Sequence, residues 1–299
     1  MPWRRRVFLN GGKQGVIMVE KITVIGPGTM GTGIAQAFLA AGFQVVLIGR
    51  SEESLQKGLA IIKSRMDKAK EKGKLSQEEM DSALNNLSLS TNYDDGKGSS
   101  AVIEAVSEIA DTKKAVFKTA EEHIGNAILA TNTSSIPIDE LSEAVKDKDR
   151  FIGMHFFNPV PVMKPVEVIV GSRTSKNTEQ IAIQLISKCG KVPVTVKDYP
   201  GFVANSILMP MLNEAIILLE KGVSTKEGID TIIKLGLNHP MGPLELADYI
   251  GLDVCKDIME SIYNETKDPK FKPAGMLVKL VSEGKLGRKS GEGFYKYNK

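Results

Sequence analysis

The sequence predicts an α/β N-terminal domain followed by an all-α C-terminal domain. From Lys21 onward, short apolar runs alternate with helical stretches, which is typical of a parallel sheet covered by helices on both faces. After Asp198 the chain has helical periodicity and no convincing strand. A length of 299 residues suits about two domains. We therefore expect one domain at 18–199 and a second at 200–299.

Residues 1–17 are expected to lie outside this fold. They carry three consecutive arginines at 4–6, but the apolar run that follows has three residues and is too short for a secretory signal. Glycines at 11, 12 and 15 interrupt any amphipathic helix of the organelle-transit type. We interpret the stretch as a disordered leader, an extension or a misplaced start, and expect a cytoplasmic protein.

The elements of the first domain follow in order along the chain. Strands are expected at 22–25, 45–48, 102–105, 128–131, 151–154, 166–170 and 192–196. Helical stretches at 30–41, 52–72 and 112–123 lie between several of them, and Ser76 with Glu79 has the spacing of a capping box for another short helix. This order predicts a doubly wound sheet.

The second domain is predicted from one broad apolar helical face. Its residues follow i, i+3, i+4 spacing: Ile207, Leu208, Met211, Leu212, Ala215, Ile216 and Leu219. The leucine and methionine faces of this region exceed what about a hundred residues need for an internal core, so a homodimer is expected.

Composition and charge exclude several classes of protein. A composition of 42% hydrophobic and 25% charged residues is that of a globular protein, and no run approaches the ~20 apolar residues that cross a bilayer. The net charge of +3 depends on residues 1–17, because the remaining chain has 35 basic against 36 acidic residues. Nucleic acid is therefore not an expected partner. Cys189 and Cys255 are expected to be structural free thiols, and no metal-ligand cluster is recognisable.

A glycine-rich turn follows the first strand and opens the first helix. Its residues are Gly26, Pro27, Gly28, Thr29, Met30 and Gly31, in the G-x-G-x-x-G spacing of a Rossmann-type domain. Such glycines let a pyrophosphate approach the unpaired amides at the positive end of the helix. The alternative is a tight strand-to-helix turn without a ligand. The βαβ context favours a bound dinucleotide.

The residues at the end of the second strand indicate whether the dinucleotide is NAD or NADP. NAD-binding proteins usually place an acid there for the adenosine ribose hydroxyls, but this strand ends in Gly49, Arg50 and Ser51. A 2′-phosphate can pair with the Arg50 guanidinium and accept a hydrogen bond from Ser51. NADP is therefore expected in preference to NAD. The alternative is a solvated Arg50 and a Ser51 that only caps the next helix.

One of the three histidines stands at the end of a predicted strand. His155 follows the apolar run 151–154, at the strand ends where open α/β sheets bind ligands. Twelve residues later, Glu167 lies in an apolar strand where an unpaired carboxylate is costly, so it needs a partner. An imidazole partner would leave the other ring nitrogen for proton exchange with a substrate oxygen. A purely structural hydrogen bond is the alternative.

Polar residues also follow the strand at 128–131. The stretch 131–135 reads Thr-Asn-Thr-Ser-Ser, and includes Asn132 and Ser134. These hydroxyl and amide groups either hold a substrate carbonyl or cap a helix that starts after Pro137. Spacing alone leaves both interpretations open.

Seven motifs together resemble the L-3-hydroxyacyl-CoA dehydrogenase family, most closely its short bacterial 3-hydroxybutyryl-CoA dehydrogenases. They are GPGTMG at 26–31, NTSS at 132–135, HFFNPVPVM at 155–163, VEVI at 166–169, PGFVAN at 200–205, HPMGP at 239–243 and GRKSGEGFY at 287–295. The resemblance runs from about residue 18 to residue 299. It implies a Rossmann domain, a helical dimerising domain, and hydride transfer between a nicotinamide cofactor and C3 of an acyl-CoA such as acetoacetyl-CoA.

The resemblance also implies roles for individual residues. The catalytic set would be His155 as acid/base, Glu167 as its orienting carboxylate, and Ser134 and Asn205 at the substrate oxygen and the histidine. Glu108 and Lys113 would lie near the nicotinamide half of the cofactor, with Asn132 and Asn158 as further cofactor contacts. Lys72 would contact coenzyme A, although the lysine-rich helix around it also suits a solvated face.

The implied reaction is the reversible reduction of a short-chain 3-ketoacyl-CoA to the (S)-3-hydroxyacyl-CoA in fatty acid or butyrate metabolism. Many relatives have an aspartate where this chain has Gly49 and Arg50, which agrees with a preference for NADP, with NAD as the alternative. Two other functions stay open. One is a different β-hydroxyacid dehydrogenase, and the other is a non-catalytic NADP-binding structural or sensor protein.

Overall fold

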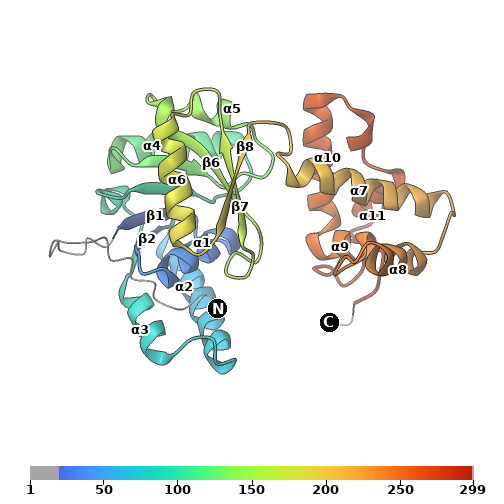
Figure 1. Cartoon of the computed structure of the whole chain (residues 1–299), viewed down its shortest axis with the longest axis horizontal. Helices are drawn as coiled ribbons and strands as arrows, with labels where there is room; N and C mark the ends of the chain where they lie inside the picture. The colour runs from blue at the N-terminus through green and yellow to red at the C-terminus, as the bar shows by residue number, and fades with distance from the viewer. Residues whose placement is uncertain (1–19, 298–299) are drawn as a thin grey trace. The chain divides into compact units, whose positions relative to one another are not determined.

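The computed structural model describes residues 20–297, so the interpretation of residues 1–17 lies outside the described part of the chain. The chain divides between Asp198 and Tyr199 into two compact units. Figure 1 shows the first unit as a sheet with helices and the second as a group of helices. The predicted combination of an α/β domain with a helical domain is confirmed.

The first unit contains an eight-stranded sheet in the order β3-β2-β1-β4-β5-β6-β7-β8. The strands are β1 (Lys21–Ile25), β2 (Gln44–Ile48), β3 (Leu87–Ser90), β4 (Ala101–Glu104), β5 (Ile128–Thr131), β6 (Phe151–Phe156), β7 (Pro165–Val170) and β8 (Val192–Lys197). All neighbours are parallel except β6 and β7, which are antiparallel. The expectation of an entirely parallel sheet is therefore wrong at this pair. The eight residues between β6 and β7 are too few for a crossover helix, so β7 returns antiparallel beside β6.

Helices cover both faces of the sheet, as a doubly wound fold requires. They are α1 (Thr29–Ala40), α2 (Glu52–Glu71), α3 (Gln77–Asn85), α4 (Ala110–Ile124), α5 (Ile138–Ser142) and α6 (Lys176–Lys188), with short 3₁₀ turns η1 (Tyr93–Gly96) and η2 (Lys148–Arg150). The capping box predicted at Ser76 and Glu79 is present at the start of α3. The apolar residues of α1, α2 and α6 share one core with alternate residues of the strands. α4 and α5 contact the opposite face, where Phe117 of α4 meets Phe151 of β6.

The six inner strands, β1, β2 and β4 to β7, are nearly continuous apolar runs because they are buried on both faces of the sheet. Alternation still decides which way each side chain points. Met154 and Phe156 belong to the core beneath α1 and α6. His155, which lies between them, therefore points to the face that α4 and α5 cover. The same parity places Glu167 on that face, because Val166 and Val168 belong to the first core.

The second unit is built from five α-helices in the described residues 199–297. They are α7 (Ala204–Glu220), α8 (Lys226–Gly236), α9 (Pro243–Ile250), α10 (Leu252–Thr266) and α11 (Gly275–Ser282), with a 3₁₀ turn η3 (Pro269–Phe271). Two isolated bridges near the C-terminus, Gly287 with Glu292 and Glu292 with Lys296, are the β pairing of this region. Leu212, Ala215 and Ile216 of the predicted α7 face are buried, whereas Ile207 is 66% exposed.

Two buried carboxylates hold the start of α9 and the end of the GRKSGEGFY motif in the second unit. Asp248 accepts hydrogen bonds from the amides of Phe294 and Tyr295, each at 2.9 Å. Asp230 accepts from the Leu244 amide at 2.8 Å and from the Tyr295 hydroxyl at 2.8 Å. These contacts bind the C-terminal segment and the first turn of α9 to the helical core. The GRKSGEGFY motif therefore has a structural role in this unit.

Candidate active site

The glycine turn lies between β1 and α1 and leaves the helix N-terminus accessible. Gly26 has φ +107°, and a Cβ at this position would lie 2.6 Å from the Ala105 carbonyl oxygen. A Cβ on Gly31 would lie 1.8 Å from the Gly26 carbonyl oxygen, so this position also requires glycine. Gly28 and Thr29 are exposed, and no side chain caps the first turn of α1. The unpaired amides of that turn form a site suited to an anion.

The end of β2 presents Arg50 and Ser51 beside this turn. Arg50 is exposed. Ser51 caps α2, because its Oγ accepts from the Ser54 amide at 3.2 Å, so the predicted helix cap is present. The Ser51 hydroxyl retains its own proton for donation. Gly49 is buried, and a Cβ there would meet Leu55 at 2.9 Å.

His155 and Glu167 are directly opposite each other on β6 and β7. The antiparallel register pairs them, and His155 Nδ1 lies 2.7 Å from Glu167 Oε2. The strand extends to Phe156, so His155 lies inside β6 and not after its end as the sequence suggested. Both side chains are buried, at 8% and 6% exposure. A proton on Nδ1 that is donated to the ionised carboxylate accounts for the short contact, and Nε2 then faces away from Glu167.

Ser134 completes a row of three polar side chains. Its Oγ lies 3.2 Å from His155 Nε2, on the side of the ring away from Glu167. Asn132, in the same segment, accepts a hydrogen bond from the Phe156 amide at 2.9 Å and so ties the segment after β5 to the strand that carries the histidine. α5 has no side-chain cap at its N-terminus, so the residues at 131–135 do not cap that helix as the sequence allowed.

Glu108 binds the segment that contains Ser134. Its Oε1 accepts from the Thr133 hydroxyl at 2.6 Å and from the amides of Ser134 and Ser135 at 2.7 and 3.0 Å. Lys113 Nζ lies 3.2 Å from Glu108 Oε2. Burial alone would raise the pKa of Glu108, but the Lys113 charge and the hydrogen bonds from Thr133 and Ser134 outweigh it and lower the pKa.

Lys113 is itself buried, at 1% side-chain exposure, and its main partner was not predicted. Nζ contacts both carboxylate oxygens of Glu104, at 2.8 and 3.1 Å. Glu104 also accepts from the Thr131 hydroxyl at 2.8 Å. Sequence reasoning missed Glu104 and Thr133 as members of this cluster. The available signal was a glutamate that ends an apolar strand, the same feature that singled out Glu167.

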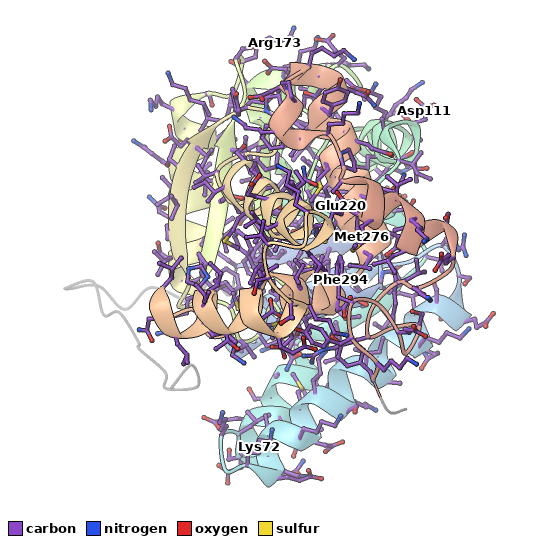
Figure 2. All side chains as sticks on the ribbon, turned by 90° about the vertical axis from the view of Figure 1, so that its right-hand side faces the viewer. Lys72, Asp111, Arg173, Glu220, Met276 and Phe294 are labelled. Carbon is purple, nitrogen blue, oxygen red and sulfur yellow. The ribbon has the colours of Figure 1, made fainter. Side chains whose placement is uncertain are left out.

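The other predicted residues lie in different places. Asn158 is exposed in the loop after β6. Asn205 lies in the first turn of α7 in the second unit. Lys72 is the exposed C-cap residue of α2. Figure 2 places Lys72 at one end of the first unit and Asp111, three residues from Glu108, well away from it.

Two other kinds of feature, a metal-binding cluster and a membrane-spanning helix, are absent from the described residues 20–297. Within this range, no group of three or more His, Cys, Asp or Glu side chains is arranged to hold a metal ion. Among the helices of the described residues, none is long and apolar enough to cross a membrane. Cys189 and Cys255 are free thiols, as predicted.

The glycine turn and its sheet define a nicotinamide-dinucleotide-binding domain, and a buried histidine–carboxylate pair stands on the same sheet. Residues 21–199 match the family described as 3-hydroxyacyl-CoA dehydrogenase, NAD binding domain. Residues 201–297 match 3-hydroxyacyl-CoA dehydrogenase, C-terminal domain. The chain belongs to the 3-hydroxyacyl-CoA dehydrogenase family.

Relatives match along nearly the whole chain. A 3-hydroxybutyryl-CoA dehydrogenase of Clostridioides difficile is 48% identical over 280 residues, covering 93% of this chain and 100% of the relative. A probable 3-hydroxybutyryl-CoA dehydrogenase of Bacillus subtilis is 46% identical over 280 residues, covering 93% and 98%. The crystal structure of the (S)-3-hydroxybutyryl-CoA dehydrogenase of Ralstonia eutropha is similar with a TM-score of 0.91 at 47% identity, covering 94% of this chain and 100% of that one.

Proposed function

We propose that this protein reversibly reduces a short-chain 3-ketoacyl-CoA, with acetoacetyl-CoA as the first substrate to test, to the (S)-3-hydroxyacyl-CoA. The observation that carries the proposal is the row formed by the buried Glu167 and His155 and the half-buried Ser134. A histidine held by a carboxylate on one nitrogen, with a hydroxyl at the other, is suited to move a proton to or from a substrate oxygen. The names of the relatives support the acyl-CoA substrate.

In the proposed mechanism, His155 donates the Nε2 proton to the C3 oxygen during reduction. Ser134, which is 3.2 Å from that nitrogen, helps to orient the same oxygen. Glu167 keeps the proton on Nδ1 and stabilises the positive ring before it donates. In the oxidation direction the same nitrogen accepts the proton. Asn205 is proposed as a further contact of the substrate oxygen. Lys72 is proposed to contact the coenzyme A moiety of the substrate.

The residues around the glycine turn fit a nicotinamide cofactor, because Gly28 and Thr29 are exposed, the space around the Gly28 Cα is open, and no side chain caps the helix end. When bound, the cofactor supplies the hydride for C3. The amides at Gly28, Thr29 and Met30 would hold the diphosphate. Asn132 and Asn158 are proposed to line the same side of the sheet.

We propose NADP as the preferred form of the cofactor, with NAD as the alternative. Arg50 is exposed beside the turn and Ser51 can donate its hydroxyl proton, so both suit a 2′-phosphate. Gly49 places no carboxylate at the strand end, where NAD-binding proteins usually carry one. Its buried Cα lies close to Leu55, so an aspartate there would also require Leu55 to move.

The test is a parallel assay of acetoacetyl-CoA reduction with NADPH and with NADH at equal concentration. We expect faster loss of nicotinamide absorbance with NADPH. Faster loss of absorbance with NADH would support the proposed reaction but contradict the NADP preference. No loss of absorbance with either cofactor would favour a non-catalytic dinucleotide-binding protein. His155→Gln should reduce kcat by about 10²- to 10⁴-fold. His123→Gln, on the exposed side of α4, is the matched control and should keep the wild-type rate.

We also propose that residues 200–299 form a dimerisation and substrate domain in a cytoplasmic homodimer. α8 exposes Ile232 at 65% and Leu235 at 80%, and Leu237 just beyond the helix is 61% exposed. An apolar patch of this kind is typical of a surface that a partner covers. Sedimentation of wild type and of Leu235→Glu tests the proposal: we expect a dimer that the substitution dissociates, and a monomeric wild type would contradict it.

A further inference from the structure

We propose that Phe157 is a positioning residue that holds the plane of the His155 ring, and that Lys191 fixes the loop that presents Phe157. The loop is the connection between β6 and β7, residues 157–164. The inference rests on the proposed function, because the orientation of the imidazole matters for a reaction only if the ring exchanges a proton with a substrate. It adds a support on the face of the ring, whereas the contacts described so far lie at its edge.

The first observation is the contact between the Phe157 ring and the imidazole of His155. The two ring centroids are 4.9 Å apart, and the ring planes are tilted by 50°. Phe157 comes two residues after His155, so the alternation of β6 brings both side chains to the same face of the sheet. Aromatic rings at this separation attract each other in tilted arrangements. The half-buried Phe157 ring therefore packs against the ring that carries the proton.

The second observation is that the hydrogen bonds at the two ring nitrogens restrain His155 incompletely. Nδ1 lies 2.7 Å from Glu167 Oε2, and Nε2 lies 3.2 Å from Ser134 Oγ. Tilting the ring about the line that joins these two partners changes neither distance much. A side chain packed on the ring face opposes this tilt. The tilt matters because a displacement of about 1 Å at the reacting atoms can slow a reaction about 10²-fold.

The third observation is that Lys191 ties down the loop that carries Phe157. Lys191 lies between α6 and β8, and its Nζ donates to the Val160 carbonyl at 2.6 Å and to the Met163 carbonyl at 2.8 Å. Burial lowers the pKa of Lys191, so its ammonium depends on these two carbonyls to replace the water that it loses. The lysine therefore binds the loop at two points.

Val160 is a further anchor of the same loop. Its side chain is 2% exposed and belongs to the core beneath α1. A Cβ on Gly33 of α1 would lie 2.9 Å from the Val160 Cβ, so the helix and the loop are in close contact. The Pro159 carbonyl accepts from the amides of Val162 and Met163, at 2.9 and 3.0 Å. The loop is thus a fixed support for the aromatic ring.

The test measures acetoacetyl-CoA reduction by Phe157→Leu, Phe157→Tyr and Lys191→Met. Leucine has no ring face, so we expect kcat to fall about tenfold or more, with KM for acetoacetyl-CoA within about threefold of wild type. Tyrosine retains the ring and should keep kcat within about threefold of wild type. Lys191→Met should lower kcat about three- to tenfold, and should cost little more in the Phe157→Leu background, because the ring through which it acts is already lost.

The turn η1 provides matched controls, because it repeats both kinds of contact at a histidine outside the proposed site. Lys21 Nζ donates to the carbonyls of Asp95 and Lys97, at 2.6 and 2.9 Å. Tyr93 of the same turn faces His123, with ring planes that are also tilted by 50° and centroids 6.4 Å apart. Lys21→Met and Tyr93→Leu should therefore leave kcat unchanged.

Two kinetic results would overturn the inference. A rise in KM of about tenfold or more in Phe157→Leu, with kcat retained, would favour a direct contact between this ring and the substrate. Fully multiplicative losses in the double variant of Phe157→Leu and Lys191→Met would mean that the lysine does not act through the ring.

Histidine NMR separates this inference from the proposed function, because it needs no turnover. The chain has three histidines, so protein labelled with ¹³C at histidine Cε1 should give three ring signals, and the one lost in His155→Gln belongs to His155. That signal should move in Phe157→Leu and in Lys191→Met, because the ring current of Phe157 acts on it, while the His123 signal stays in place. If wild type fails to reduce acetoacetyl-CoA, the proposed function falls, while a moved signal still supports the positioning of the ring. A His155 signal that keeps its wild-type position in either variant would refute the inference whether or not the enzyme is active.

Discussion

The contact between His155 and Glu167 gives a prediction that can be worked through quantitatively. Nδ1 and Oε2 are 2.7 Å apart, and both side chains are less than a tenth exposed. Opposite charges about 4 Å apart interact by about 4 kcal/mol at an effective dielectric constant of ~20. A charge-assisted hydrogen bond contributes about 1.5–3 kcal/mol. Glu167→Gln keeps the shape and removes the charge, so we expect transition-state stabilisation to fall by about 2–4 kcal/mol.

That loss corresponds to a decrease in kcat of about 30- to 900-fold. KM for acetoacetyl-CoA should change little, because Glu167 acts through the histidine. The assay is steady-state reduction at saturating cofactor, with the melting temperature recorded for each variant. Glu179→Gln is a suitable control, since Glu179 is also nearly buried and paired with a lysine, Lys176 at 2.7 Å, on a helix away from the site. A kcat for Glu167→Gln within about threefold of wild type would refute the reasoning.

Four further predictions concern the cofactor, the fold and the buried groups. Arg50→Ala should raise the KM for NADPH about tenfold and leave that for NADH unchanged in steady-state assays, because it removes the cation beside the 2′-phosphate. Gly31→Ala should lower the melting temperature and abolish its rise on adding NADPH, because the new methyl would lie 1.8 Å from the Gly26 carbonyl oxygen. Burial raises the pKa of Cys255 to about 12, so iodoacetamide labelling at pH 8, followed by mass spectrometry, should be slow until guanidinium exposes the thiol. The pKa of Glu108 is lowered in the folded chain, so its contribution to stability is complete above the ordinary glutamate pKa of about 4.3 and is lost as pH falls through the folded pKa. Glu108→Gln removes this titrating group and should flatten the acid side of the profile of melting temperature against pH.

Each of these predictions has a contrary result. Equal losses with NADH and NADPH in Arg50→Ala would remove the 2′-phosphate argument. A Gly31→Ala variant that still melts higher with NADPH would show that the turn relaxes around the methyl group. Rapid labelling of Cys255 in the native protein would mean that the thiol is accessible. If Glu108→Gln leaves the acid side of the profile of melting temperature against pH unchanged, another group is responsible for that pH dependence.

The sequence predicts most of the first unit because its inner strands are buried on both faces and therefore consist mainly of apolar residues. β3 (Leu87–Ser90) was missed, since it alternates leucine with serine at the edge of the sheet and never forms such a run. The direction of β7 was also missed, because an apolar run indicates that a strand is buried but not whether it is parallel or antiparallel to its neighbour. That direction depends on the length of the connection to β6.

The contact between His155 and Glu167 is predictable from a free-energy argument, because a carboxylate in an apolar strand needs a partner. Their catalytic roles stay predictions. The cluster of Glu104, Lys113 and Glu108 is harder to find from sequence. Its members lie on a strand, a helix and the loop between them, and only the packing of α4 against the sheet brings the lysine between the two carboxylates. Spacing along the chain does not encode that packing.

The β6–β7 hairpin has a consequence for how the contact between His155 and Glu167 forms. His155 and Glu167 are twelve residues apart and meet across one short connection, so their contact has a low sequence separation and little loop-closure entropy to overcome. The glycine turn, by contrast, is far from His155 in the sequence, and only the packing of the sheet connects the two. We therefore expect the pair to form early in folding and to move as one unit when this segment is exchanged between relatives.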